Sequence, residues 1–127
     1  MSKYRNLTEL EKLIARYRKR LGIPERYILY TSVVKEKDWL PVHANDEAYI
    51  RDSKNYPKSD LFLRYKTLKE KSDTHVRRLI CHELLHIIIG TMFQRLKPNY
   101  SYGKQGKVEE ELVILMSYAI VPGEDDD

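Results

Sequence analysis

The amino-acid sequence predicts a single α+β domain made of a helix, a small three-stranded sheet and two further helices, in that order. Three observations support this prediction. Apolar residues recur with helical spacing near the N-terminus, three short strand-like runs follow, the first of them rich in β-branched and aromatic residues, and two longer apolar segments occupy the second half. A chain of 127 residues fits one domain, which we expect to span residues 1–122.

Residues 7–21 are predicted to form an amphipathic helix. Its apolar side chains recur at spacings of three and four residues and so share one face: Leu7, Leu10, Leu13, Ile14, Tyr17 and Leu21. Asn6 or Thr8 can cap the first turn, because a short polar side chain accepts hydrogen bonds from the backbone amides there. Gly22, followed by Pro24, is placed to end the helix.

Three strands are predicted between this helix and the next. Residues 27–34 are rich in the β-branched and aromatic side chains typical of strands, residues 47–51 form a short second strand with alternating Ala48 and Ile50, and residues 60–66 form the third. The turn-forming residues in 35–46 and 52–59 predict connecting loops. We expect the third strand, which precedes the next helix, to lie at the edge of the sheet.

A long apolar helix follows. Ser72 or Asp73 caps it, it runs to about Ile89, and Gly90 is placed to end it. Because its apolar surface is broad, we expect it to form the buried centre of the domain.

The last third of the chain predicts a loop, a helix and a tail. Residues 91–106 are polar and contain a proline and two glycines, which predicts a loop after a short helical extension. Residues 108–120 are predicted to be helical, and Pro122 ends this helix. The acidic residues 123–127 are predicted to form a flexible tail.

The composition indicates an ordinary globular protein, with 42% hydrophobic and 33% charged residues. The net charge is +4, and without Glu124–Asp127 the chain holds 23 basic against 15 acidic residues. Because the basic residues are scattered, a solvated surface explains them better than an acidic partner. With one cysteine, no signal-peptide core and no membrane-length apolar run, we expect a cytoplasmic protein that does not contact a membrane.

The most informative motif is His82-Glu83-Leu84-Leu85-His86, in the long apolar helix. On a helix, His82 and His86 lie one turn apart, so both imidazoles can hold one metal ion. Glu83 lies next to the first histidine, where its carboxylate can take a proton from a water molecule that the metal activates. The pattern therefore predicts a zinc-binding helix with its own general base.

Two structural interpretations of the motif compete with this one. In the first, both histidines are hydrogen-bonded core residues and Glu83 pairs with Arg78. In the second, the metal is structural, but such zinc usually has four protein ligands, mostly cysteines. Cys81 points about 100° away from His82 on a helix, so we expect a packed core thiol. Three good ligands remain, which leaves one position for water and favours catalysis.

The third ligand is predicted to come from the run Glu109-Glu110-Glu111, which opens the last helix. A third histidine after the motif is excluded, since Ile89 and Met92 occupy the relevant places. The apolar face of the last helix is centred on three residues: Leu112, Met116 and Ala119. Glu109 lies closest to that face, and we favour it, with Glu110 and Glu111 as alternatives.

In these features the chain resembles a zincin metallopeptidase of the gluzincin type, in particular the minimal soluble gluzincins of about this length. The resemblance covers residues 27–121, in which an edge strand precedes the HELLH helix and a second helix carries the glutamate. It implies a zincin-like fold in which the two histidines and one glutamate bind Zn²⁺. It also implies that Glu83 is the general base and acid of peptide hydrolysis. One departure is Val113, because gluzincins often place Asp or Asn four residues after the ligand glutamate.

The sequence therefore predicts a zinc-dependent metalloendopeptidase, a hydrolase acting on a peptide or protein substrate. The strand that ends near Lys66 could bind an extended substrate by strand addition. Four residues are candidates for stabilising the oxyanion, and we select none of them: His75, Tyr100, Tyr102 and Tyr118.

Two further hypotheses concern regulation and binding. The acidic tail, residues 123–127, could occupy the cleft and inhibit the enzyme. The alternative function is a catalytically weak or inactive zincin-fold binding or regulatory module, possibly associated with nucleic acid, since the body is basic and has ten tyrosines. The chain has no recognised nucleic-acid motif, so this function ranks second. Its oligomeric state has no sequence signal.

Overall fold

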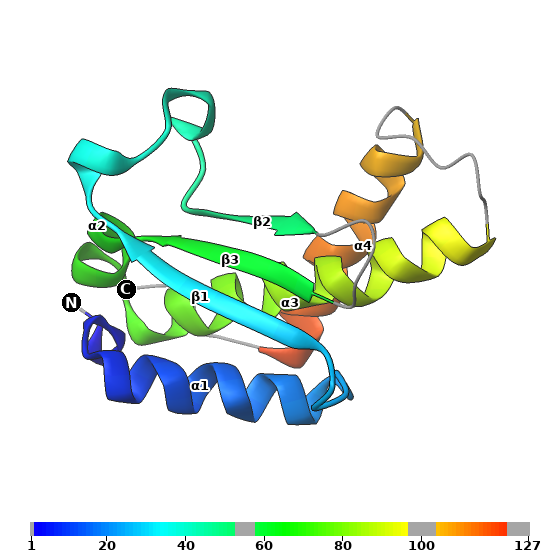
Figure 1. The fold of residues 1–127 in the computed structure, drawn as a ribbon, viewed down its shortest axis with the longest axis horizontal. Coiled ribbons are helices and arrows are strands. Elements are labelled where there is room, and N and C mark those ends of the chain that lie inside the picture. Colours follow the sequence, from blue (N-terminus) through cyan, green and yellow to red (C-terminus); the bar gives the residue numbers. More distant parts are fainter. Residues whose placement is uncertain (1, 53–57, 97–103, 122–127) are drawn as a thin grey trace.

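The computed structural model describes residues 2–52, 58–96 and 104–121 (Figure 1). Its helices are α1 (Leu7–Arg20), α2 (Tyr65–Glu70), α3 (Asp73–Leu96) and α4 (Lys104–Ile120). Its strands are β1 (Ile28–Val34), β2 (Ala48–Asp52) and β3 (Lys58–Arg64), and three short 3-10 helices cover Lys3–Arg5, Glu36–Asp38 and Pro41–His43. The α+β class and the order of the predicted elements are therefore confirmed for this part of the chain.

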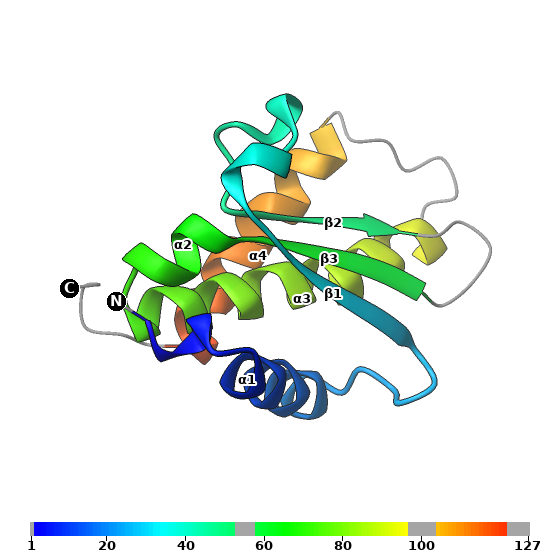
Figure 2. The same ribbon diagram turned by 60° about the vertical axis from the view of Figure 1, so that its left-hand side comes forward.

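The sheet is mixed, with strand order β1-β3-β2. β1 runs parallel to β3 and β2 runs antiparallel to it, so that Leu61 lies opposite both Thr31 and Ile50. Along β3, Ser59, Leu61 and Leu63 are buried, because alternate side chains of a strand point to one face. Helices α1 and α3 lie on that face (Figures 1 and 2).

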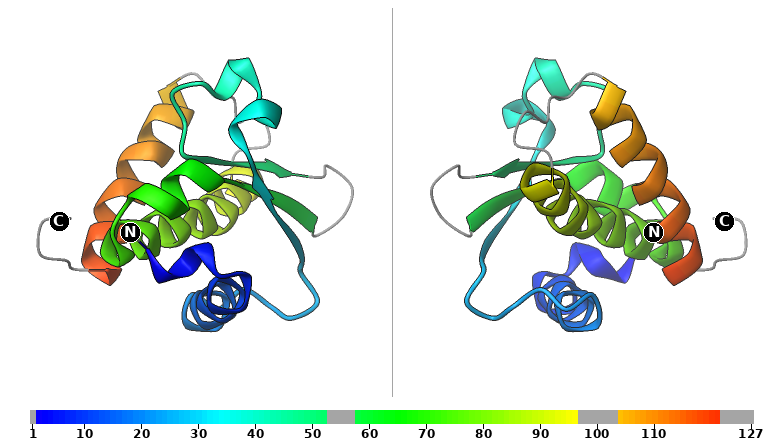
Figure 3. Two further views of the ribbon diagram at one scale, coloured as in Figure 1. Left: turned by 90° about the vertical axis from the view of Figure 1, so that its left-hand side faces the viewer. Right: turned by 90° about the vertical axis from the view of Figure 1, so that its right-hand side faces the viewer.

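Helix α3 is the centre of the domain, as its apolar surface predicted. It contacts α1, β2 and α4, and α1 and α4 lie on different sides of it (Figure 3). Its fully buried side chains come from three of its turns: Val76, Ile80, Cys81, Leu84 and Leu85. The histidine motif therefore lies on the most firmly packed element of the fold.

Helix α1 forms as predicted, and Asn6 is its cap. The Asn6 side-chain oxygen accepts hydrogen bonds from the amides of Thr8 at 2.9 Å and Glu9 at 3.3 Å. Gly22, just past the helix, has a φ of 74°, a left-handed conformation that glycine adopts without strain.

The structure corrects the third predicted strand in two ways. Residues 65 and 66 belong to α2, a short helix that the sequence pattern did not reveal. β3 is also the central strand, not an edge strand, so the edges are β1 and β2. β3 is central because it pairs with β1 along one side and with β2 along the other, although both strands precede it in the chain.

The structure also corrects the end of the long helix. α3 continues through Gly90 to Leu96, and α4 begins at Lys104, so residues 91–96 and 104–106 of the predicted loop are helical. A methyl group added at Gly90 would lie only 3.3 Å from a carboxylate oxygen of Glu109. Gly90 therefore permits a close approach of α4 to α3 and does not end the helix.

Arg64, on the outer face of the sheet, fixes the segment that leads into β2. Its guanidinium donates to both carboxylate oxygens of Glu36, at 2.6 and 2.8 Å, and to the carbonyls of Ala44 at 2.8 Å and Asp46 at 3.1 Å. These bonds hold residues 45–48 beside α3, where they help to form the candidate site.

No helix in the described part of the chain is both long and apolar enough to cross a lipid bilayer. The turn predicted for residues 52–59 is narrower, because Asp52 belongs to β2 and residues 58–59 belong to β3. Residues 53–57 and the predicted acidic tail lie outside the described residues.

Leu84, which is fully buried in α3, should be essential for stability. We predict that Leu84→Ala lowers the free energy of unfolding by about 2–5 kcal/mol, because it removes buried methyl groups and leaves a cavity. Urea denaturation measures this change. The matched control is Leu115→Ala on α4, where the side chain is 69% exposed, and we expect a change within about 0.5 kcal/mol. Equal effects of the two substitutions would contradict the observed packing.

Candidate metal centre

His82 and His86 place their Nε2 atoms side by side. The two atoms are 3.3 Å apart, and the ring centroids are 4.9 Å apart. The geometry follows from their spacing of one helical turn on α3. Both side chains are about one-fifth exposed, so they lie at the edge of the buried face of α3.

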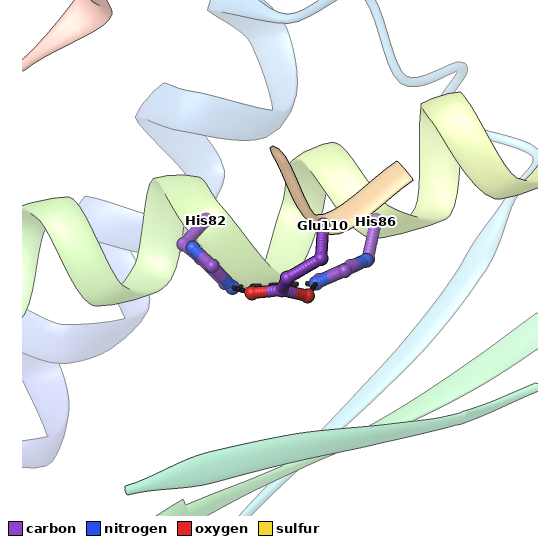
Figure 4. A group of neighbouring side chains, drawn as sticks. All are labelled: His82, His86 and Glu110. Atoms are coloured by element: carbon purple, nitrogen blue, oxygen red, sulfur yellow. Dashed lines mark hydrogen bonds and ion pairs between the residues drawn. The ribbon is translucent and has the colours of Figure 1, made fainter. Parts of the chain in front are cut away.

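Glu110, from the second turn of α4, completes a group of three around this point (Figure 4). One of its carboxylate oxygens lies 3.0 Å from Nε2 of His82, and the other lies 2.9 Å from Nε2 of His86. Ligand atoms of all three residues lie within 4.8 Å of one another. Within the described ranges, this is the one such group that could hold a metal ion.

Glu109 does not occupy the position that the sequence analysis favoured for it. Its carboxylate lies 2.7 Å from Nδ1 of His86, on the opposite side of the ring from Nε2. We therefore replace Glu109 with Glu110 as the candidate third ligand.

The face of α4 that is buried against α3 explains this difference. It consists of Glu109, Val113 and Ser117, and it continues into Val121 just after the helix. Leu112 and Met116, which the sequence pattern predicts at its centre, are 38% and 41% exposed. The buried Glu109 side chain thus contacts Nδ1 of His86 between α3 and α4. Glu110, which is more exposed, contacts the Nε2 atoms of both histidines. Glu111 is exposed.

The three donors fit a zinc ion in kind and in spacing. Two imidazole nitrogens and one carboxylate are a known zinc ligand set for catalytic sites. A tetrahedral zinc with bonds of about 2.0–2.1 Å separates its ligand atoms by roughly 3.3 Å. The nitrogen–nitrogen distance of 3.3 Å already matches this value, and the oxygens, at 2.9 and 3.0 Å, need to move by only a few tenths of an ångström.

The protonation of His82 also suits a ligand. Burial lowers its pKa below the ordinary value, and His86 lowers it further, while Glu110 acts in the opposite direction. At neutral pH the His82 ring is therefore mostly uncharged, with one nitrogen carrying a lone pair.

Glu83 is buried beside the cluster, with 8% of its surface exposed. Burial raises its pKa to about 7; Glu110 and Asp46 act in the same direction, and His86 opposes them. A carboxyl group that titrates near neutrality can both accept and donate a proton under physiological conditions.

Cys81 is a core residue, as its position on the helix predicted. It is 0% exposed, and burial raises the pKa of its thiol to about 11. A thiol held in this neutral form is not a metal ligand.

A pocket of about 390 Å³ opens beside His82 and Glu83. Its walls come from the segment before β2, from the first half of α3 and from the second half of α4: Asn45, Asp46, Glu47, Ala48, His75, Arg78, Leu79, Ile114, Ser117 and Tyr118. His75 bonds to Glu47 at 2.6 Å, and the guanidinium of Arg78 lies 4.0 Å from the centre of the Tyr118 ring. The pocket is therefore a cleft with charged and apolar walls next to the candidate metal centre.

Of the four oxyanion candidates named from the sequence, His75 and Tyr118 line this pocket. Tyr100 and Tyr102 lie outside the described residues. The contribution of Asp46 and Glu47 was missed, because nothing in a loop sequence indicates which helix the loop will lie against.

Comparisons with protein-family models, with curated proteins and with solved structures found no match to this chain. Any functional assignment therefore depends on the geometry of the site.

The raised pKa of Glu83 predicts how stability depends on pH in the metal-free protein. Because the folded pKa of about 7 exceeds the ordinary value of 4.5, ionising Glu83 opposes folding. The penalty is absent below about pH 4.5, grows as the pH rises, and is complete above about pH 7.

Glu83→Gln removes this penalty. We predict that the variant gains about 3 kcal/mol over the wild type between pH 4.5 and pH 8, as measured by denaturation at both values. The exposed Glu111→Gln is the control and should show no such change. A pH-independent difference for Glu83→Gln would rule out the proposed ionisation.

Proposed function

We propose that this protein is a zinc-dependent peptide hydrolase with a zincin-like arrangement of its active site. The observation that carries the proposal is the convergence of two histidines and Glu110 beside the buried Glu83, next to a pocket that His82 and Glu83 line. Perturbed titratable groups in a cleft are typical of active sites. The HELLH pattern accounts for three of these four residues, and the fold brings the fourth to them.

In this proposal, His82, His86 and Glu110 would hold the zinc ion. A zinc ion in such a site supplies an acidified water molecule and a positive charge for the carbonyl oxygen of the substrate. The ligand set uses three protein donors and leaves a coordination position for the reaction.

Glu83 moves the protons in the proposed reaction. Its carboxylate takes a proton from the attacking water and then delivers it to the nitrogen of the leaving amine. Its buried position next to His82 supports this role, because the carboxyl group lies beside the proposed ligands. The low-dielectric surroundings that raise the pKa of Glu83 also strengthen its interaction with the reacting groups.

β2 replaces β3 as the strand that would bind the substrate. It is an edge strand, it contacts α3, and its first residue, Ala48, lines the pocket. An extended peptide can add to such an edge through its backbone, while one side chain enters the neighbouring pocket. The proposal therefore retains strand addition but places the substrate along the edge strand β2 instead of along β3.

The second candidate function is a binding module without catalysis. It is favoured by exposed aromatic and basic groups on the outer face of the sheet. Lys58 lies over the ring of Tyr30, which is 56% exposed, and Arg51 lies over Phe62. Such groups can contact unpaired bases and phosphates.

The activity prediction concerns Glu83→Gln in the full chain loaded with zinc. We expect the variant to retain one zinc per chain and to lose about 10²- to 10⁴-fold in the rate of peptide cleavage, since only the proton transfers are removed. Metal analysis and a mixture of fluorogenic peptides measure the two quantities. The matched control, Glu111→Gln, should cleave at the wild-type rate.

Two outcomes would contradict the proposed hydrolase. One is full activity in Glu83→Gln with zinc retained. The other is a zinc-loaded wild type that cleaves no peptide but is retained on single-stranded nucleic acid in a salt-dependent manner, which would favour the binding module.

Residues 123–127 lie outside the described residues, so inhibition by the acidic tail stays a prediction. If the tail occupies the cleft, deleting these residues should raise the rate of peptide cleavage. The deletion and the full chain are compared at equal zinc content, and equal rates would dismiss the idea.

A further inference from the structure

The two adjacent glutamates of α4 contact different nitrogens of the same histidine. Glu110 lies 2.9 Å from Nε2 of His86, at the cluster, while Glu109 lies 2.7 Å from Nδ1, on the other side of the ring. Their exposure differs as sharply, since the side chain of Glu110 is 46% exposed and that of Glu109 is 6% exposed. Neighbours in sequence therefore have distinct surroundings.

The contact of Glu109 fixes which nitrogen of His86 carries the proton. A neutral imidazole has one N–H group and one nitrogen with a lone pair. A carboxylate only accepts hydrogen bonds, so Nδ1 of His86 carries a proton that it donates to Glu109. In the neutral ring that a metal ion would require, the lone pair therefore lies at Nε2, which faces Glu110. That is the form required for Nε2 to bind a metal ion, and the same bond prevents the ring from flipping.

Gly90 provides the space for this carboxylate. It lies one turn after His86 on α3, directly beneath the position that Glu109 occupies. A Cβ atom at residue 90 would approach the Glu109 carboxylate to 3.3 Å from one oxygen, 3.8 Å from the carbon and 3.9 Å from the other oxygen. A Cβ atom here is tighter than an ordinary van der Waals contact, so the carboxylate would have to shift by a few tenths of an ångström to make room for it.

We propose that Glu109 is a positioning residue of the metal centre and that Gly90 leaves the space its carboxylate needs. Glu109 holds His86 in the metal-binding tautomer and orientation, while Glu110 binds the ion. The inference rests on the proposed metal site and assigns a role to a buried carboxylate that the hydrolytic mechanism does not use. It also explains why a glycine stands in the middle of a long helix, where it is otherwise unfavourable.

Zinc titration of the metal-free full chain against a competing chelator tests this assignment. We expect Glu109→Ala to bind zinc about 10- to 100-fold more weakly than the wild type, the usual effect of removing such a partner. Glu109→Gln should recover part of the loss, because its amide oxygen still accepts a bond from Nδ1. Gly90→Ala should weaken binding in the same direction, and the exposed Glu111→Gln should leave the affinity unchanged.

Cobalt(II) absorption separates positioning from general destabilisation. Loaded with cobalt, Glu109→Ala should show an altered ligand-field spectrum, whereas Leu84→Ala, which destabilises the same helix, should keep the wild-type spectrum. Thermal unfolding of each metal-free variant establishes that it is folded.

The failures of the two proposals can be told apart. A wild type that binds no zinc overturns the proposed function itself. A wild type that binds zinc, together with a folded Glu109→Ala of equal affinity and unchanged cobalt spectrum, overturns only the role of Glu109. Wild-type affinity in Glu110→Gln with complete loss in Glu109→Ala would reverse the two assignments.

Discussion

The close contact between α3 and α4 at Glu109 is the interaction on which the candidate site depends. α3 brings together two histidines and Glu83 by helical spacing alone, but the third donor must come from another element. α4 meets α3 where the Glu109 carboxylate lies against Gly90 and accepts a hydrogen bond from Nδ1 of His86. With Glu109 in that place, the next residue, Glu110, contacts the Nε2 atoms of both histidines. A shift of α4 along α3 would break the contacts of Glu109 and of Glu110 with the histidines at the same time.

The charges around the site are consistent with a cation at its centre. Glu83 and Glu109 are buried carboxyl groups, and Glu110 lies between two imidazoles. Burying such groups is unfavourable unless each has a partner or a metal ion nearby. Glu110 and Asp46 raise the pKa of Glu83, so the carboxylates act on one another. A divalent cation would be the largest local charge and would offset this repulsion.

The elements set by local patterns were predictable from the sequence, and those set by tertiary packing were not. The Asn6 cap and the apolar face of α1 follow from nearest neighbours, as does the pairing of the motif histidines. Gly90 carries the local signal of a helix end, while its place in the structure is to accommodate another helix. Glu109 lies on the buried face of α4, as its position in the sequence predicts, but its carboxylate contacts Nδ1 of His86, and Glu110 lies at the two Nε2 atoms. Which glutamate meets the Nε2 atoms depends on how α3 and α4 pack together, which the local pattern does not contain. The position of β3 in the centre of the sheet depends on which strands pair, a long-range property.

The central claim is that His82, His86 and Glu110 together bind one zinc ion. Anomalous diffraction at the zinc absorption edge, from crystals of the zinc-loaded full chain, tests it most directly. The account predicts one strong peak per chain, about 2.0–2.1 Å from Nε2 of both histidines and from an oxygen of Glu110, with Glu109 still bonded to Nδ1 of His86. A peak coordinated by Glu109 in place of Glu110, or no peak at the two histidines, would contradict it.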